Sequence, residues 1–463
     1  MKLYTNFSLA TEIQDVAKLF IDDTELVQSL PADIVLNESV EGGVYYYVAT
    51  FFARVEIQRV DVNGFDELHS MRLRKRYAKL CMYNLLSKVT GKKMPWGSLT
   101  GIRPTKLARQ FELEGLSWQE AFTTLGVSPE KIDVVAQILA IQGDLRPDES
   151  AADLYVGIPF CTSRCSYCSF TSGEIDRLKK YVDPYVDVLK ADIRQTIDFA
   201  RSKGIAINNV YFGGGTPTSL SASQLDSILN EIDFVPKEFT VEAGRPDTID
   251  EQKLAVFKKH GVDRISINPQ TFNQSVLDVI GRRHSVEDIY DKYRLAKSFG
   301  FVVNMDLIAG LPTETYEMFC HSVDSAIALS PDNITVHTLA LKHGSALKER
   351  GYQAEDDVSQ MVAYASEKLH AAGYRPYYMY RQKYMAQNLE NVGYCKSGMQ
   401  CLYNVGIMEE ITNILACGTN AISKRISVAN NRIERSANAK DVITYIERAQ
   451  DYIDKRFHLF SQD

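Results

Sequence analysis

The sequence predicts an α/β protein built on a partial (β/α)6 barrel, with an N-terminal α+β domain before it and a C-terminal extension after it. The first observation is that six short apolar segments alternate with longer amphipathic segments between residues 153 and 372. Such repeats indicate a parallel sheet with right-handed crossovers. The second observation is that cysteine-rich, glycine-rich and polar residues follow these segments, at the edge where α/β barrels carry their sites.

The 463-residue chain is long enough for two or three domains. We assign residues 1–150 to the N-terminal α+β domain, whose role is unclear, residues 151–375 to the barrel, and residues 376–463 to the extension. The first 60 residues are rich in β-branched and aromatic side chains, which predicts strands. Helical periodicity before the barrel covers residues 66–86, 116–126 and 129–143. Residues 94–106 are predicted to form an ordered loop.

The barrel elements follow one another as strand and helix in turn. The predicted strands are residues 154–158, 209–212, 239–243, 264–267, 302–308 and 333–339. The predicted helices are residues 175–203, 222–233, 250–260, 273–280, 286–299, 315–329 and 355–372.

The composition is ordinary for a soluble globular protein, with 45% hydrophobic and 24% charged residues. The sequence contains no 18-residue apolar span and does not start with a signal-peptide pattern, so we expect a cytoplasmic protein without a membrane partner. Eight cysteines in such a chain indicate reduced thiols and metal ligation. The net charge of −7 argues against a surface that binds nucleic acid as a whole.

One segment is strongly basic, although the whole chain has a net negative charge. Residues 68–111 contain eleven Lys or Arg residues and no Asp or Glu. This block is either a solvated helix face followed by a loop or an anion contact for substrate carboxylates or an RNA backbone.

Three cysteines, Cys161, Cys165 and Cys168, fall within eight residues directly after the first predicted barrel strand. Three thiolates can hold three irons of a [4Fe–4S] cluster and leave the fourth iron open to a small molecule. A structural zinc site with a distant fourth ligand and a coincidental grouping are the alternatives. A disulfide is less favoured without a secretory signal.

The other strand ends carry residues that suit a ligand. Gly213–Thr218 follows the second strand, Glu242 ends the third, Gln270 follows the fourth, and Asp306 lies in the fifth. A glycine run lets the backbone approach a ligand, although most such runs mark tight turns. Taken alone, Glu242 and Asp306 would more often serve a structural hydrogen bond than a ligand. Their shared place at the strand ends favours a common site.

The spacing Cys-x3-Cys-x2-Cys, with Tyr167 before the last cysteine, resembles the radical S-adenosylmethionine (SAM) superfamily. The resemblance implies that SAM binds the open iron and yields a 5′-deoxyadenosyl radical, which abstracts a hydrogen atom from the substrate. It implies that the cluster ligands are Cys161, Cys165 and Cys168. It implies that SAM is contacted by Tyr155, Tyr167, Gly213, Gly214, Gly215, Thr216, Glu242, Gln270, Arg282, Asp306 and Ala340.

Longer motifs narrow the resemblance. The runs YVGIPFC from residue 155, GGGTPT from 213, SINPQTF from 266 and NMDLIAGLP from 304 resemble HemN-type oxygen-independent coproporphyrinogen III dehydrogenases. The runs GIRPTK from 101, VEAGRPD from 241, NLENVGYCKSG from 388 and LACGTNAISK from 415 resemble the HemZ branch of that family.

This resemblance implies an activity and its partners. The expected reaction is the oxidative decarboxylation of two propionates of coproporphyrinogen III to give protoporphyrinogen IX in anaerobic heme biosynthesis. The expected partners are this tetrapyrrole and a reduced flavodoxin- or ferredoxin-type electron donor. The alternatives are a HemW-like heme-binding or heme-trafficking protein and a radical SAM enzyme that acts on another tetrapyrrole or on RNA.

Several residues bear on the choice between these functions. Phe170 stands where HemN-type enzymes have a fourth cysteine, and Gly157 stands where they have a histidine. Heme ligation is conceivable at His337 and His343, although a core or surface role is commoner. Substrate carboxylates call for cations, and the candidates are Arg245, Arg283, Arg381, Lys383 and the loop 103–106. The tail cysteines Cys395, Cys401 and Cys417 are interpreted as buried free thiols because their spacing is irregular.

Overall fold

The computed structural model describes residues 1–341, 344–352, 357–382, 385–427 and 432–461. The chain divides into two compact units. The N-terminal unit comprises Met1–Leu139 together with Tyr380–Glu390, and the barrel unit comprises Ala140–Met379 together with Asn391–Asp463. These units are defined by packing, so the assignment of roles to residues 1–150, 151–375 and 376–463 stays a prediction.

The N-terminal unit contains a five-stranded sheet in the order β2-β1-β3-β4-β5. Its elements are β1 (Lys2–Thr5), α1 (Ala10–Ala17), β2 (Glu25–Leu26), β3 (Ile34–Glu41), β4 (Val44–Phe51), β5 (Arg54–Asp61) and α2 (Glu67–Thr90). Strands β3, β4 and β5 form an antiparallel meander, and β1 pairs with β2 and β3 in parallel. The predicted α+β character of this region is confirmed.

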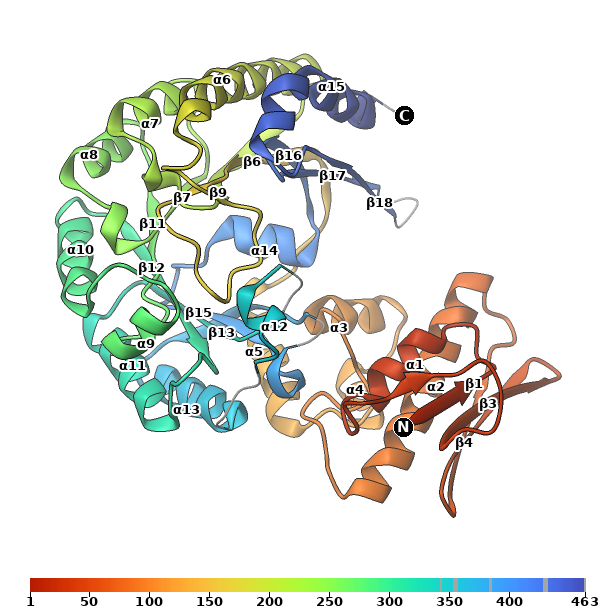
Figure 1. Cartoon of the computed structure of the whole chain (residues 1–463). Helices are drawn as coiled ribbons and strands as arrows, with labels where there is room; N and C mark the ends of the chain where they lie inside the picture. Colours follow the sequence, from red (N-terminus) through yellow and green to blue (C-terminus); the bar gives the residue numbers. More distant parts are fainter. Residues whose placement is uncertain (342–343, 353–356, 383–384, 428–431, 462–463) are drawn as a thin grey trace. The chain divides into compact units, whose positions relative to one another are not determined.

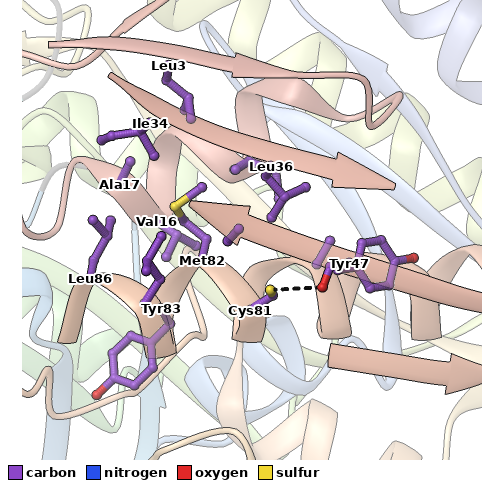
Figure 2. Packing of buried hydrophobic residues seen from close by; sticks show 14 of the residues in the cluster. Leu3, Val16, Ala17, Ile34, Leu36, Tyr47, Cys81, Met82, Tyr83 and Leu86 are labelled. Carbon is purple, nitrogen blue, oxygen red and sulfur yellow. Dashed lines mark hydrogen bonds between the residues drawn. The ribbon is translucent and has the colours of Figure 1, made fainter. Parts of the chain in front are cut away.

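The core of this unit lies between the sheet and helices α1 and α2, as Figure 2 shows. Leu3, Leu36 and Tyr47 from the strands meet Met82 from α2, and all four side chains are buried. Helix α2 begins at Asp66, whose carboxylate accepts a hydrogen bond from the backbone N–H of His69 at 2.8 Å. This cap satisfies one of the free N–H groups at the helix start.

Three helices follow, namely α3 (Pro104–Leu113), α4 (Trp118–Thr124) and α5 (Pro129–Gln142). The helices predicted over residues 66–86, 116–126 and 129–143 are confirmed, whereas the sequence reading missed α1 and α3. Helix α3 starts inside the predicted loop, because Pro104 supplies the fixed φ that suits a first helical position. The distant segment Tyr380–Glu390 packs here, since Glu390 accepts a hydrogen bond from Trp96 Nε1 at 2.7 Å.

Six parallel strands form the centre of the barrel unit, as the sequence predicts. They are β6 (Asp148–Ile158), β9 (Ala206–Gly214), β10 (Glu238–Gly244), β11 (Arg264–Ile267), β12 (Val302–Ala309) and β13 (Asn333–Thr338). Each pairs in parallel with the next strand along the chain. Their buried hydrophobic side chains are mostly Val, Ile, Leu and Phe, which is typical of strands covered on both faces.

Helices cover the outer side of this curved sheet (Figure 1). They are α6 (Lys179–Ser202), α7 (Ala222–Leu229), α8 (Glu251–Lys259), α9 (Gln274–Val279), α10 (Val286–Ser298), α11 (Tyr316–Leu329) and α13 (Val358–Ala371), with a short α12 (Ala346–Glu349) after β13. The seven predicted helices of the barrel are therefore confirmed. No helix among the described residues is long and apolar enough to cross a membrane.

The C-terminal extension adds strands to both edges of this sheet. Its elements are β14 (Arg375–Tyr380), β15 (Asn391–Cys395), α14 (Leu402–Glu409), β16 (Thr412–Gly418), β17 (Ile422–Ser427), β18 (Arg432–Ala437) and α15 (Val442–Ser461). Strand β15 pairs with β13 in antiparallel orientation, whereas β16 pairs with β6 in parallel at the opposite edge. The sheet therefore runs β14-β15-β13-β12-β11-β10-β9-β6-β16-β17-β18.

Part of the extension also lies inside the barrel, at the amino ends of the strands. Glu238, Arg264 and Asn333, which each begin a strand, hold the segment before α14. Arg264 Nη2 donates to the carbonyls of Met399 and Gln400 at 3.2 and 3.1 Å. The Cys401 thiol donates to Glu238 Oε1 at 3.2 Å. Cys395, Cys401 and Cys417 are buried free thiols, as interpreted from the sequence.

Candidate active site

The cysteine loop, residues 161–168, follows β6 at its carboxyl end. The short strand β7 (Phe160–Cys161) pairs with β8 (Gly173–Glu174) and fixes the start of the loop. Burial raises the pKa of Cys168 to about 11, and the charges of Cys165 and Cys161 add to this rise, so the three thiols are electrostatic neighbours. Within the described part of the chain, no three Cys, His, Asp or Glu side chains form a ready metal-binding group. The thiols are thus gathered on one loop without being preset in ligand geometry.

Loops that follow other strands hold this cysteine loop. After β11, Gly281 accepts from Ser163 Oγ at 3.0 Å, and Ile280 accepts from the backbone N–H of Ser166 at 3.0 Å. After β13, the backbone N–H of Leu347 donates to Ser166 at 3.1 Å. The cysteine loop is therefore fixed by segments that are more than 100 residues away in the sequence.

The glycine run packs directly on the backbone that leads into the cysteine loop. The N–H groups of Gly215 and Thr216 donate to the carbonyls of Ile158 and Phe160, both at 2.7 Å. A side chain at residue 215 would bring its Cβ within 2.6 Å of the Phe160 oxygen, so glycine is required there. Thr216 Oγ1 lies 3.5 Å from Cys161 Sγ.

Two carboxylates lie on the inner face of the barrel. Glu242 Oε1 accepts a hydrogen bond from Tyr211 at 2.5 Å, and burial raises the pKa of Glu242 to about 7. Asp306 accepts a hydrogen bond from Asn304 Nδ2 at 2.8 Å and lies 3.6 Å from His337 Nε2. Burial favours the neutral form of Asp306, but the hydrogen bond and charge of His337 lower its pKa overall. The two acids thus have opposite tendencies to ionise.

Gln270 lies between these strands in an unusual backbone conformation. Its φ is +68°, in the left-handed region that non-glycine residues rarely adopt. Its backbone N–H donates to Asp306 at 2.9 Å, and its carbonyl accepts from Ile308 at 3.0 Å. This bridge to β12 holds the strained residue and fixes Gln270 beside Asp306. Ala340 lies two residues beyond β13 and is half-buried.

Arg282 lies against the cysteine loop with most of its guanidinium unused. Its Nη2 donates to the Tyr167 hydroxyl at 2.8 Å. Nε and Nη1 are buried and have no hydrogen-bond partner among the described residues. Buried donors without acceptors are costly, so this fork fits an anionic group such as a carboxylate.

Tyr155 belongs to an aromatic stack that the sequence reading did not find. Tyr403 on α14 stacks on Tyr211 with ring centroids 4.2 Å apart, and Tyr155 lies 6.3 Å from each. Helix α14 lies inside the curve of the sheet in Figure 1. Tyr403 is about 250 residues from Tyr155 and lies outside the motifs of the sequence analysis, so the sequence carries no signal for this contact beyond the aromatic ring itself.

Known proteins are similar to this chain in sequence and in fold. The sequence model of the radical SAM superfamily matches residues 155–326. The oxygen-independent coproporphyrinogen-III oxidase-like protein HemZ of Bacillus subtilis is 36% identical over 97% of this chain and 95% of its own length. The chain belongs to the radical SAM superfamily and to its HemZ family. Members of the superfamily use a [4Fe–4S] cluster and SAM, and these are the cofactors of this radical SAM protein.

Two further proteins are similar to parts of this HemZ-family chain. The heme chaperone HemW of Bacillus subtilis is 31% identical over 54% of this chain and 65% of its own length. The structure of coproporphyrinogen III oxidase (HemN) from Escherichia coli, described as a radical SAM enzyme, matches with a TM-score of 0.51. It is 23% identical and covers 68% of this chain and 72% of that one, so it supports the fold alone.

In this radical SAM protein, Gly157 stands where HemN-type enzymes have a histidine, and it lies close to the backbone of the C-terminal strand. Gly157 pairs with Gly418 of β16, and a Cβ at residue 157 would lie 3.0 Å from the carbonyl oxygen of Thr419. The close approach of the C-terminal strand therefore leaves little room for a side chain there. Phe170, at the other departure, is 60% exposed.

The sequence suggested several cations as contacts for substrate carboxylates, and the structure places them in different surroundings. Arg245 is buried under the cysteine loop and bonded to Ser163. Arg381 belongs to the N-terminal unit, where it donates to the carbonyl of Leu99 at 3.0 Å. Both guanidinium groups are therefore occupied, whereas Arg283 is exposed. Lys383 and His343 lie outside the described residues.

The basic block of the N-terminal unit is largely paired with acids from outside the block. The ion pairs are Arg74–Glu38, Lys75–Glu12, Arg76–Glu114, Lys79–Glu12 and Lys88–Glu56. Arg103 and Lys106 also have partners. The block is thus a paired helix surface to a large extent, which supports the first of the two interpretations and weakens the case for an RNA contact.

Proposed function

We propose that this chain is a radical SAM oxidoreductase that converts coproporphyrinogen III to protoporphyrinogen IX in anaerobic heme biosynthesis. The observation that carries this proposal is its 36% identity to an oxygen-independent coproporphyrinogen-III oxidase-like protein over 97% of the chain. The reactive groups at the carboxyl ends of the barrel strands are consistent with it.

In this proposal, Cys161, Cys165 and Cys168 ligate the cluster. The orphaned fork of Arg282 binds the SAM carboxylate, and Glu242 binds a cationic or hydroxyl donor of SAM. The further SAM contacts are Tyr155, Tyr167, Gly213, Gly214, Gly215, Thr216, Gln270, Asp306 and Ala340. Together, the cluster and SAM supply one electron and a radical able to remove a hydrogen atom.

The reaction balances for each propionate. The side chain –CH2–CH2–COO⁻ loses one hydrogen atom, one CO2 and one electron, and a vinyl group remains. The hydrogen atom leaves with the deoxyadenosyl product, and the electron goes to a one-electron acceptor. A reduced flavodoxin- or ferredoxin-type protein is the proposed donor for SAM cleavage. Arg283, which is exposed beside Arg282 in the sequence, is the proposed cation for a substrate carboxylate.

The test is an anaerobic assay with the reconstituted protein, SAM, a reductant and coproporphyrinogen III. Mass spectrometry should show 5′-deoxyadenosine together with mono- and divinyl products. Cys161→Ser should abolish both, whereas Cys320→Ser, which changes a half-buried thiol on α11, should leave both unchanged. Deoxyadenosine without any decarboxylated tetrapyrrole would contradict the proposed substrate.

Heme binding by a HemW-like protein is the second candidate, and the 31% identity to HemW favours it. Stoichiometric heme binding in the same sample, without vinyl products, would support it. His337 Nε2 lies 3.6 Å from Asp306 Oδ2, so heme ligation through this nitrogen would require the contact to open. The cytoplasmic location stays a prediction.

A further inference from the structure

The loop after β10 reaches under the cysteine loop through one side chain, Arg245. Its Nη1 donates to Ser163 Oγ at 2.8 Å and to the Ser163 carbonyl at 3.1 Å. The same nitrogen lies 3.9 Å from Cys165 Sγ, within the range of an N–H···S hydrogen bond. Arg245 is 3% exposed, so this cation is held next to a thiol in a water-poor environment.

Asp247 fixes the orientation of that guanidinium. Its two carboxylate oxygens accept from Nε and Nη2 of Arg245 at 3.1 and 3.3 Å. Thr162 Oγ1, also in the cysteine loop, donates to Asp247 Oδ2 at 3.0 Å. Because the Asp247 carboxylate binds Nε and Nη2 of Arg245, the remaining nitrogen, Nη1, points toward Ser163 and Cys165. A bidentate pair of this kind gives geometric precision as well as attraction.

We propose that Arg245 is a positioning residue that holds Ser163 and Cys165 and raises the reduction potential of the iron–sulfur cluster. A positive charge and an N–H donor next to a ligand sulfur stabilise the reduced cluster, which carries one more negative charge. This inference rests on the proposed ligation by Cys161, Cys165 and Cys168, but it is independent of the tetrapyrrole substrate.

The role differs from the substrate contact that the sequence suggests for Arg245. A cation that meets a substrate carboxylate needs free donors at the mouth of the site. Here the donors are bonded to the chain itself and the side chain is buried. Arg245 therefore acts on the substrate only through the cluster loop.

The experiment compares Arg245→Gln and Arg245→Lys in the full-length, anaerobically reconstituted protein. Iron and sulfide content establish cluster occupancy, and redox titration followed by electron paramagnetic resonance gives the reduction potential. Arg245→Gln should lower the ratio of reduced to oxidised cluster at a fixed potential by about tenfold, equivalent to a potential about 59 mV more negative for one electron. Arg245→Lys keeps the charge and should shift the ratio by less than about threefold.

Two further variants make the result decisive. Asp247→Asn removes the neutralising carboxylate and should shift the ratio in the opposite direction, toward the reduced cluster. Arg194→Gln is the matched control, because Arg194 is an exposed arginine on α6 that pairs with Glu231. It should leave the potential unchanged.

The outcomes separate the inference from the proposed function. Some Arg245 or Asp247 variants will retain the cluster. If the reduction potential of these variants equals that of the wild type, the inference is overturned. A shift in Arg194→Gln as large as that in Arg245→Gln also overturns it, because net charge would then explain both. If the potential shifts but no tetrapyrrole is decarboxylated, the inference stands and the proposed substrate fails. A wild-type protein that binds no cluster contradicts both.

Discussion

The two ends of the barrel carry similar buried charges that are used differently. At the amino end, Arg264 donates through Nη1 and Nη2 to Asn333, Glu238 and the carbonyls of Met399 and Gln400, and its Nε lacks a partner among the described residues. At the carboxyl end, Arg282 donates to Tyr167, and its Nε and Nη1 lack partners among the described residues. The chain's own tail thus satisfies much of one end, whereas the other end keeps donors free for a ligand. We therefore expect loss of Arg264 to leave buried partners unpaired, whereas loss of Arg282 leaves fewer.

The largest effect is expected from replacing a cysteine at the carboxyl end of the barrel, compared with replacing one at the amino end. Cys168→Ser should reduce cluster content to background and bring deoxyadenosine formation below detection, because one of three ligands is lost. Cys401→Ser at the amino end should retain the cluster, since its thiol donates to Glu238 and serine can do the same. Iron analysis and the visible absorption of the reconstituted proteins check both results. Equal loss of iron in the two variants would remove the distinction between the ends.

The next effect concerns stability at the amino end. Arg264→Met leaves Glu238 buried without its cation and frees the carbonyls of the tail, so it should lower the free energy of unfolding by about 3–5 kcal/mol. Urea unfolding followed by far-ultraviolet circular dichroism measures this loss. The double variant Arg264→Met with Glu238→Gln should recover part of it. Arg282→Met is the matched change at the carboxyl end and should cost less, because it breaks one hydrogen bond, the one to the Tyr167 hydroxyl. A larger loss in Arg282→Met would reverse the comparison.

A third effect is a pH dependence confined to the carboxyl end. Burial raises the pKa of Glu242 to about 7, so its carboxylate form dominates only above pH 7. If that form binds the SAM ammonium, the SAM dissociation constant should rise by up to about tenfold for each pH unit below 7. Without SAM, the raised pKa makes stability highest below the unfolded value of 4.5, and that contribution is lost as pH rises through 7.

Calorimetric titration with SAM at several pH values checks the Glu242 prediction. Glu242→Gln keeps an acceptor for Tyr211 and should give weaker, nearly pH-independent binding. A wild-type affinity that stays constant between pH 6 and pH 8 would argue against a role for Glu242 in binding a cation.

The smallest effect concerns the stack that connects the tail to the site. Tyr403→Leu removes the ring that stacks on Tyr211, whose hydroxyl orients Glu242, and should cost about 1 kcal/mol of SAM binding, a few-fold in affinity. Tyr403→Phe keeps the ring and should bind SAM as the wild type does. An equal loss in both variants would indicate that the Tyr403 hydroxyl is the important group.

The sequence predicted the parts of this protein that depend on near neighbours. The apolar runs and the helix periods predicted the six parallel strands and the helices between them, whereas the functional role of the residues after each strand stays a prediction. The buried, free tail thiols were also interpreted correctly from their irregular spacing. These features are readable because periodicity and turn chemistry act over a few residues.

Only the tertiary structure decided which distant segments meet. Strand β16 pairs with β6 across more than 250 residues, and this pairing leaves little room for a side chain at residue 157. The same holds for Tyr403, which stacks near Tyr155, and for Arg245, which donates to Ser163 of the cysteine loop. Local sequence patterns predict that a strand, an aromatic ring or a cation will be buried. The partner depends on the packing of the whole chain, because burial alone does not specify a partner.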